Sequence, residues 1–318
     1  MPYPDSPRLT ALISLRDFAP AAGSGYIYAG GPEERAAHVD TWVSTRSIST
    51  AEVRQQDAAA ISVQVGGGHY DVQLRSHAAL DRLLGLLPNE LYLDITGLGH
   101  HVWAPLLRAA IVARKRLWGV YAEPGEYTRT ATPTEGTIYD LSERIVGISP
   151  LPGFATLREM DRDSYAFIPL LGFEGTRLIH VLEHVQPPGD ATIPIVGVPG
   201  FRAEYPFVSL KGNRKALIDG GHWVNIRFAR ANCPFDVFFT LRSVMADFQR
   251  DYLRIAPIGT KPHGLGAVLF ALSAESRVEL IYDHPIRKPG RTSGVARICV
   301  YDIATFVMSE DFNWAATV

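Results

Sequence analysis

The segment Pro257–Gly264 has the residue types of an anion-binding turn between a strand and a helix. The apolar run LRIA precedes it and the apolar run GLGAVLFAL leads away from it. Backbone N–H groups and the positive end of the helix dipole favour an anion at such a helix start. Gly259 permits close approach, Thr260 offers a hydroxyl and Lys261 supplies charge, so we predict that these three residues contact a phosphate-bearing ligand. The alternative is a tight structural turn with an exposed lysine, and the Walker spacing GxxxxGK[ST] is absent.

A second turn of this kind spans Gly172–Arg177, again between an apolar strand and a helical stretch. We predict ligand contacts here at Gly172, Glu174, Gly175 and Arg177. The guanidinium fork of Arg177 matches a phosphate or carboxylate, and Glu174 would accept a hydrogen bond from a ribose hydroxyl or a base edge. The alternative is a helix start at which Glu174 complements the helix dipole and Arg177 points to solvent.

Two carboxylates follow strands in the first half of the chain. Asp94 precedes Gly97 at the end of the run LYLDITG, and Glu123 ends the run GVYAE. On neighbouring parallel strands the two acids would hold Mg²⁺ or do acid–base work, so Asp94, Gly97 and Glu123 join the predicted ligand-binding residues. The simpler alternative has Asp94 capping the turn and Glu123 solvated. We favour this alternative and predict no metal, because the spacing places no third acid or catalytic base beside them.

The residues His180, Glu183 and His184 match the pattern H-x-x-E-H. This pattern resembles the zinc helix of pitrilysin-like peptidases, in which a further glutamate downstream completes the ligand set. No glutamate occurs between Glu204 and Glu275. We therefore predict a partly exposed helix face and no zinc.

Three strand–helix–strand units position these residues. In each, an apolar strand runs into a glycine and a second strand closes at a proline, with separations of 27, 27 and 26 residues from Gly97, Gly172 and Gly259. This is the size of one compact βαβ unit, so we predict that the three strands are parallel and that each leads directly into a helix. The fold class predicted is α/β, with tandem Rossmann-like halves and mostly parallel sheets. We assign residues 1–130 to the N-terminal half, 131–164 to a connecting region and 165–318 to the C-terminal half, whose last strand (GVARICVYDI) closes a sheet edge.

The composition excludes several classes of protein. The chain has 318 residues, a formal net charge of −2 and two cysteines, Cys233 and Cys299. This charge gives no general attraction to nucleic acid or to an anionic membrane. Two cysteines cannot build a disulfide scaffold or a thiolate metal cage. We find no signal-peptide pattern and no apolar run of 18 residues, and we expect a cytoplasmic protein with no membrane association.

The turn at Gly259, Thr260 and Lys261, with Gly264 and Gly266 on the helix that follows, resembles the T-G-G-T-K turn of CRISPR-associated Rossmann-fold (CARF) domains. The similarity covers one unit of about 33 residues, and Ile258 stands where the family has the first glycine. Two such folds in tandem also resemble the related SAVED modules. The resemblance implies a site for a cyclic oligonucleotide messenger beside this turn and a role in prokaryotic antiviral defence.

Anion-binding turns without a catalytic set favour a nucleotide-binding sensor or regulatory subunit. Such a protein would need a protein partner or self-association for its output, since no effector domain remains in the chain. No cofactor other than a possible nucleotide ligand is indicated, and catalytic residues stay unassigned. One alternative is a nucleotide- or nucleoside-processing hydrolase or transferase that uses Asp94, Glu123 or Glu174 as its acid–base residue. A further alternative is a scaffold subunit that binds only protein. A filled crevice at the strand ends would favour this alternative.

Overall fold

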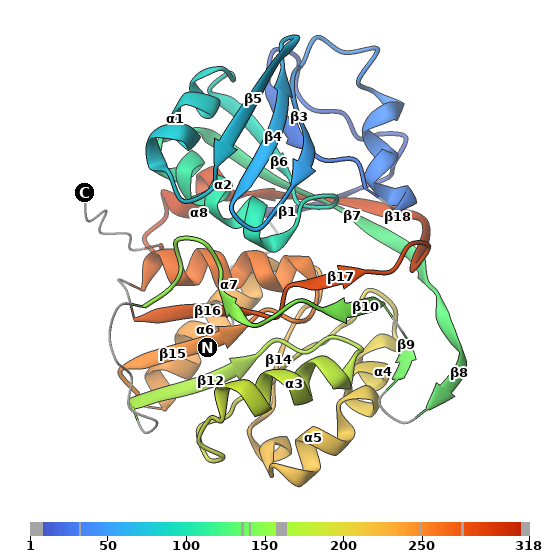
Figure 1. Cartoon of the computed structure of the whole chain (residues 1–318), viewed down its shortest axis with the longest axis vertical. Helices are drawn as coiled ribbons and strands as arrows, with labels where there is room; N and C mark the ends of the chain where they lie inside the picture. The colour runs from blue at the N-terminus through green and yellow to red at the C-terminus, as the bar shows by residue number, and fades with distance from the viewer. Residues whose placement is uncertain are drawn as a thin grey trace. The chain divides into compact units, whose positions relative to one another are not determined.

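The chain forms two compact units, and each contains both helices and strands (Figure 1). The computed structural model describes residues 9–31, 33–134, 137–139, 141–156, 164–248, 250–274 and 277–312. We name the units by their order in the chain: the terminal unit comprises described residues from 9–127 and 292–312, and the inserted unit comprises those from 128–291. The last strand therefore belongs with the N-terminal sheet, whereas the sequence assigned residues 165–318 to a C-terminal half.

The terminal unit contains an eight-stranded sheet with helices between several of its strands. Its elements are β1 (Thr10–Ile13), β2 (Gly25–Tyr28), the 3-10 helix η2 (Glu34–Thr41), β3 (Ser49–Gln56), β4 (Ala60–Val65), β5 (Gly68–Gln73), α1 (His77–Gly85), β6 (Glu90–Asp94), α2 (His100–Val112), β7 (Arg116–Tyr127), β18 (Thr292–Asp302) and α8 (Ile303–Val307).

The strand order of this sheet is β1-β18-β7-β6-β2-β3-β4-β5. The four central strands β7, β6, β2 and β3 are parallel, and the strands outside them pair antiparallel. The predicted edge position of β18 is wrong, because β1 pairs with its outer side. The chain visits β3 on one side of β2 and then β6 and β7 on the other, so the order of the parallel strands reverses between β2 and β6.

The inserted unit alternates strands and helices from β12 onward. Its elements are β8 (Arg129–Thr134), β9 (Thr137–Tyr139), β10 (Ser142–Ile145), β11 (Ser149–Pro150), β12 (Tyr165–Pro169), α3 (Gly175–Val185), β13 (Ile195–Gly197), α4 (Tyr205–Gly212), α5 (Arg214–Asp219), the 3-10 helix η4 (His222–Asn225), β14 (Arg227–Ala229), α6 (Pro234–Asp247), β15 (Tyr252–Ala256), α7 (Lys261–Ser273), β16 (Val278–Tyr282) and β17 (Pro285–Arg287).

Five strands of the inserted unit form a parallel row in the order β14-β13-β12-β15-β16, and β11 pairs antiparallel with β16. Single parallel bridges, Phe167 with Thr192 and Leu170 with Ile195, join β12 to the segment of β13. The chain moves outward from β12 to β14, returns beside β12 as β15 and then moves outward the other way. The reversal between β12 and β15 is a topological switch point, where open α/β sheets bind their ligands.

The predicted parallel units are confirmed at all three places. The strands β6, β12 and β15 are parallel to their neighbours and lead into α2, α3 and α7, respectively. The strands β4 and β5 form an antiparallel hairpin. The predicted connecting region 131–164 contains more regular secondary structure than expected, because its described parts contribute to four short strands, β8 to β11. Residues 135–136, 140 and 157–163 of this region lie outside the described residues.

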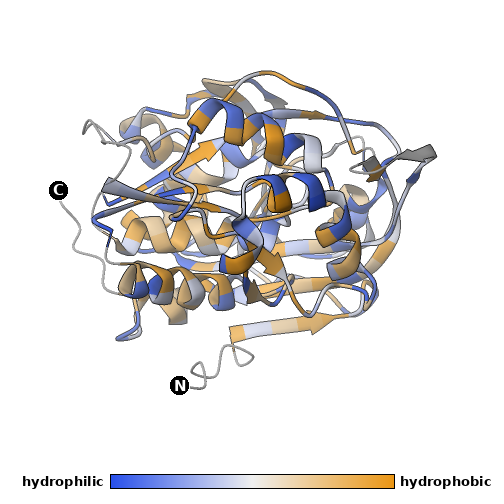
Figure 2. Ribbon diagram, turned by 90° about the horizontal axis from the view of Figure 1, so that it is seen from below, coloured by the Kyte–Doolittle hydropathy of each residue, from blue (hydrophilic) through white to orange (hydrophobic). Residues whose placement is uncertain are grey.

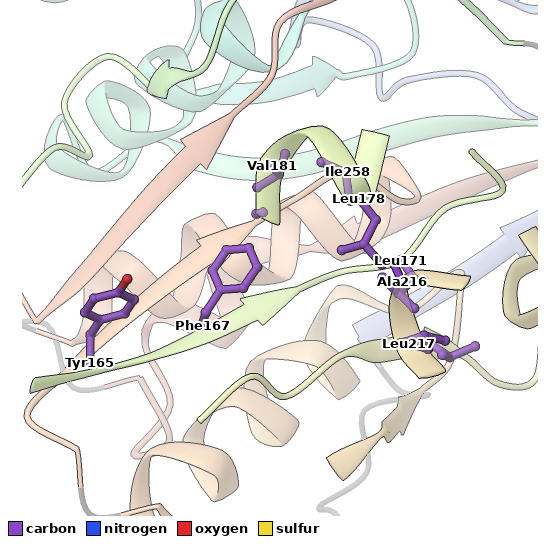
Figure 3. Packing of buried hydrophobic residues seen from close by; sticks show 10 residues of the cluster. Tyr165, Phe167, Leu171, Leu178, Val181, Ala216, Leu217 and Ile258 are labelled. Atoms are coloured by element: carbon purple, nitrogen blue, oxygen red, sulfur yellow. The ribbon is translucent and has the colours of Figure 1, made fainter. Parts of the chain in front are cut away.

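The inserted unit has one apolar cluster where α3 and α5 cover the same face of its parallel row. Figure 3 shows side chains of this cluster from three elements: Tyr165 and Phe167 from β12, Leu178 and Val181 from α3, and Ala216 and Leu217 from α5. Right-handed crossovers on the two sides of a switch point place their helices on opposite faces, so α7 lies on the other face, packed against α6. In Figure 2, hydrophobic and hydrophilic residues alternate along the helices, as expected for helices that cover a sheet. Among the described residues, no helix has the length and apolar character needed to cross a membrane.

Glycines let the loops at the start of α3 pack backbone against backbone. A Cβ added at Gly175 would lie 1.9 Å from the carbonyl oxygen of Gly212, at the end of α4. A Cβ added at Gly212 would lie 2.3 Å from the carbonyl oxygen of Phe173. Real Cβ atoms do not approach backbone this closely, so both positions require glycine for this packing.

We expect Gly175→Ala to lower the free energy of unfolding by about 1–3 kcal/mol or more, because the backbone of α4 must shift. The matched control is Gly85→Ala at the end of α1, where an added Cβ meets nothing within 4 Å. That substitution should be neutral or stabilise the protein by about 0.5–1 kcal/mol. Urea unfolding of both variants measures the difference, and equal stabilities would contradict the packing described here.

Candidate functional site

The two predicted turns meet at the switch point of the inserted unit. A Cβ added at Gly172 would lie 2.8 Å from the carbonyl oxygen of Ile258, and one at Gly259 would lie 2.6 Å from that of Leu171. The turns after β12 and β15 are therefore in backbone contact. This contact leaves no room for a ligand directly between the two turns.

Glu174 fastens a neighbouring loop. Its Oε1 accepts hydrogen bonds from the backbone N–H groups of Leu141 and Ser142, at 2.9 and 2.8 Å, and its Oε2 accepts one from the Ser142 hydroxyl at 2.8 Å. Both carboxylate oxygens are engaged within the protein. The side chain thus holds the start of β10 against the start of α3.

Arg177 is buried in a bidentate ion pair. Its Nε and Nη2 donate to the two carboxylate oxygens of Asp283, at 2.7 and 2.6 Å, and its Nη1 donates to the carbonyl oxygen of Ile258 at 2.9 Å. Burial by itself would lower the pKa of Arg177, and the adjacent Asp283 carboxylate more than offsets this and raises the pKa above its ordinary value. The alternative in which Arg177 points to solvent is therefore wrong: the guanidinium joins α3 to the residue after β16.

Thr260 and Lys261 begin α7. The Thr260 hydroxyl accepts from the backbone N–H of His263 at 3.3 Å and donates to the carbonyl oxygen of Ala231 at 2.8 Å, so it caps the helix. Lys261 is only 5% exposed, and the expectation of an exposed lysine is wrong. Its ammonium is enclosed by the fold because Pro262 and the rest of the first turn of α7 are buried with it.

His263 is buried in its neutral form at the start of α7. Its Nε2 lies 3.1 Å from the carbonyl oxygen of Arg230, and its Nδ1 has no hydrogen-bond partner among the described residues. Burial lowers the pKa of His263 to about 4, a change that the carbonyl of Arg230 only partly opposes. The folded protein therefore resists protonation of this ring.

We expect this histidine to make the stability of the protein depend on pH. Its folded-state pKa is depressed below the unfolded value of about 6.5, so the unfolded chain binds the proton first as the pH falls. The contribution to stability is complete above about pH 6.5 and decreases by up to about 1.4 kcal/mol per pH unit toward pH 4. His263→Gln, which keeps a donor for the carbonyl oxygen of Arg230, should show a smaller loss of stability between pH 7 and pH 5 in urea titrations. Identical pH dependence in the two proteins would show that His263 is not the titrating group.

The predicted residues of the terminal unit form a buried polar network. Asp94 accepts from Tyr26 through Oδ2 at 3.1 Å and from the backbone N–H of Thr96 through Oδ1 at 2.8 Å. Its Oδ2 also lies 2.6 Å from Nε2 of His38 in η2. Burial would raise the pKa of Asp94, but His38 and Thr96 lower it below its ordinary value. Gly97 packs against the turn after β2, since an added Cβ would lie 1.9 Å from the carbonyl oxygen of Ala29.

Glu123 lies apart from this network. Its carboxylate pairs with Arg297 of β18, and the side chain is only 3% exposed, so the expectation of a solvated Glu123 is wrong. In the register of β6 and β7, Asp94 stands opposite Val120, and strand alternation then places Glu123 on the other face of the sheet. The two acids do not form a shared site. The described residues also contain no group of three or more His, Cys, Asp or Glu side chains placed to hold a metal ion.

We expect Asp94→Asn to lower the free energy of unfolding by about 3–5 kcal/mol, because it removes one partner of a buried, charge-assisted pair with His38. The depressed pKa of Asp94 further implies that this stability is present above its unfolded pKa of about 3.9 and is lost as the pH falls through the folded value. Asp81→Asn, an exposed acid on α1, is the control. Equal unfolding midpoints in urea at pH 7 for Asp94→Asn and Asp81→Asn would rule out this role.

The histidines of the H-x-x-E-H pattern lie on α3, where His180, Glu183 and His184 are exposed. This is the exposed helix face that the sequence predicted. Val181 between them is fully buried in the apolar cluster of the inserted unit. The spacing of the pattern therefore reflects an amphipathic helix.

A groove between α3 and α5 is the open site nearest to the predicted turns. Its volume is about 400 Å³, and its walls combine polar, basic and apolar side chains from the two helices, among them Thr176, Ile179, Asn213, Arg214, Lys215, Ile218 and Asp219. Lys215 is exposed and forms no ion pair with any described residue. The sequence signal that would have indicated this wall is the basic run KGNRK at 211–215, which spans the junction of the short helices α4 and α5.

Asn213, in the wall of this groove, has a side-chain oxygen without a hydrogen-bond partner among the described residues. Its Nδ2 donates to the carbonyl oxygens of Gly172 and Ser209, both at 2.8 Å. Its Oδ1 is buried and has no hydrogen-bond partner in the described part of the chain, although the residue is only 1% exposed. Buried polar groups are almost always paired, so this unpaired acceptor is an exception within the α4–α5 junction.

No protein-family model matches this chain, and a search of curated proteins finds no match either. What the protein can bind is therefore inferred from its own side chains.

Proposed function

We propose that the protein is a nucleotide-binding sensor or regulatory subunit whose ligand lies in the groove between α3 and α5. The observation that carries the proposal is the position of this groove. It opens beside the first turn of α3, the helix that follows β12, and β12 is one of the two strands at the switch point where α/β sheets of this kind bind nucleotides. A volume of about 400 Å³ is within the range of small-molecule sites.

The strand order supports a Rossmann-type inserted unit. Numbered along the chain from β12, the parallel row reads 3-2-1-4-5, which matches the first five strands of the Rossmann order. The parallel strands of the terminal unit read 2-1-3-4, as in flavodoxin-like sheets. We propose that the chain combines two Rossmann-related units of different strand order, in place of two copies of one half.

The side chains of the groove suit a phosphate attached to a less polar group. The positive end of α3, the Thr176 hydroxyl and the Lys215 ammonium would bind the phosphate. Ile179 and Ile218 offer apolar contact to a sugar or a base. These functions together correspond to a nucleotide more closely than to an inorganic anion.

The engaged carboxylates favour binding over catalysis. Asp94 and Glu174 accept hydrogen bonds through both oxygens, and Glu123 is paired with Arg297. A general base needs an oxygen that can reach the substrate. The proposed enzyme mechanism therefore lacks support at each of its three candidate residues.

The glycine contacts at the switch points favour a second candidate, a scaffold that binds only protein. In both units the turns that flank the reversal touch backbone to backbone, at Gly259 with Leu171 and at Gly97 with Ala29. A ligand cannot enter between turns packed in this way. The scaffold and the sensor differ in whether the groove beside α3 binds a nucleotide.

We expect at least one nucleotide to bind the purified chain when mono-, di-, tri- and cyclic nucleotides, including cyclic oligonucleotides, are titrated by calorimetry. Lys215→Ala removes a charge-assisted contact of roughly 1.5–3 kcal/mol, so the affinity should fall about tenfold to a hundredfold. The matched control is Lys211→Ala, an exposed lysine of α4 outside the groove, which should bind like the wild type. Melting temperatures of both variants should stay close to that of the wild type.

Two results would contradict this proposal at different levels. If no nucleotide of the panel binds the wild type, the sensor function is wrong and the scaffold is favoured. If a nucleotide binds the wild type and Lys215→Ala equally well, the protein binds nucleotides but the groove between α3 and α5 is the wrong site.

A further inference from the structure

The strand β14 leaves one edge of the parallel row open. Among the described residues it pairs only with β13. The N–H of Arg227 donates to the carbonyl oxygen of Pro194, and the carbonyl oxygen of Ala229 accepts from the N–H of Val198, each at 2.8 Å. Because successive residues of a strand direct their backbone groups to opposite sides, the N–H and C=O of Phe228 point away from β13.

Large exposed apolar side chains occur on β14 and on the segments next to it in the chain and in the sheet. Phe228 is 56% exposed, and the adjacent η4 contributes Trp223 at 60% and Val224 at 62%. Val198, whose N–H binds the end of β14, is 37% exposed. We call these four residues the β14 patch.

The β14 patch lacks the charges with which proteins normally protect an open sheet edge. The edge strand β5 of the terminal unit, in contrast, exposes His69 and Asp71. At β14 the guanidinium of Arg227 lies 5.7 Å from the centre of the Phe248 ring, and alternation puts that side chain on the face opposite Phe228. An apolar, uncharged edge of this kind is typical of an interface.

From this edge we infer that the protein forms a two-fold symmetric dimer in which β14 of one copy pairs antiparallel with β14 of a second copy. Phe228 offers one donor and one acceptor in the same direction, so about a two-fold axis it exchanges both hydrogen bonds with the same residue of the second copy. The apolar patches then meet each other, and no like charges are brought together. The assembly stops at two copies, because each copy has one open β14 edge and the pairing uses it.

The area of the patch sets the expected strength of the dimer. Phe and Trp side chains bury roughly 150–250 Å² each, so Phe228 and Trp223 together expose on the order of 200–300 Å² per copy. With Val198 and Val224 the two patches reach roughly half of the 1,200–2,000 Å² that stable interfaces bury in total, and the strand pairing and rim supply the remainder. We therefore expect reversible dimerisation in the micromolar range. This inference does not depend on the proposed nucleotide groove.

Sedimentation velocity of the full chain, at concentrations below and above the micromolar range, tests the dimer. The wild type should change from monomer to dimer with increasing concentration. Phe228→Asp places two carboxylates opposite each other at the axis and should weaken dimerisation at least about tenfold. The matched control is Met308→Asp in the terminal unit, an equally conspicuous exposed side chain at 79% exposure, which should dimerise like the wild type.

A second variant, Trp223→Glu, tests the patch without altering the strand and should also weaken the dimer. Because Phe228 and Trp223 are exposed, both variants should melt close to the wild type, which separates lost pairing from lost folding. A wild type that stays monomeric throughout would overturn the inference and leave the edge to a different protein. Dimerisation that is equally strong in the wild type, Phe228→Asp and Trp223→Glu would also overturn it.

Discussion

The buried pair of Arg177 and Asp283 holds together the carboxyl edge of the inserted unit. The bidentate contact joins the first turn of α3 to the residue that follows β16, and the third bond of the guanidinium reaches the turn after β15. Asp283 is fully buried, so loss of either partner would leave an uncompensated charge in the interior. Glu174, 3.9 Å from the same guanidinium, extends the connection to the start of β10. Four separate segments are thereby fixed around one switch point.

In the terminal unit, charged side chains near the strand ends are also paired, but by different residues. Parallel strands end in polar groups and helix starts that must be paired if no ligand or water reaches them. Here Asp94 is paired with His38 and Tyr26, and Glu123 with Arg297. In both units the strand-end charges are thus used to hold elements together, and the surfaces available for binding lie outside the crevices.

One crossover contributes to both candidate binding surfaces of the inserted unit. The segment between β13 and β14 contains α4, α5 and η4, far more than a single helix needs to connect two neighbouring parallel strands. Its α4–α5 junction supplies the basic wall of the groove at Arg214 and Lys215. Its η4 supplies the exposed Trp223 and Val224 beside the open strand edge. The segment between β13 and β14 therefore contributes both to the proposed ligand groove and to the proposed dimer edge.

The sequence by itself determined the three parallel strand–helix–strand units, because periodicity, glycine turns and spacing are properties of short segments. It also identified the two turns that meet at Gly172 and Gly259, since both carry the signature of a strand leading into a helix start. Only the tertiary structure decided what the charged residues of those turns contact. The partner of Arg177 lies 106 residues away and that of Glu174 lies 32 residues away, and such pairings follow from strand order. Burial of Lys261 and the placement of β18 beside β7 were likewise set by long-range packing, which no local pattern encodes.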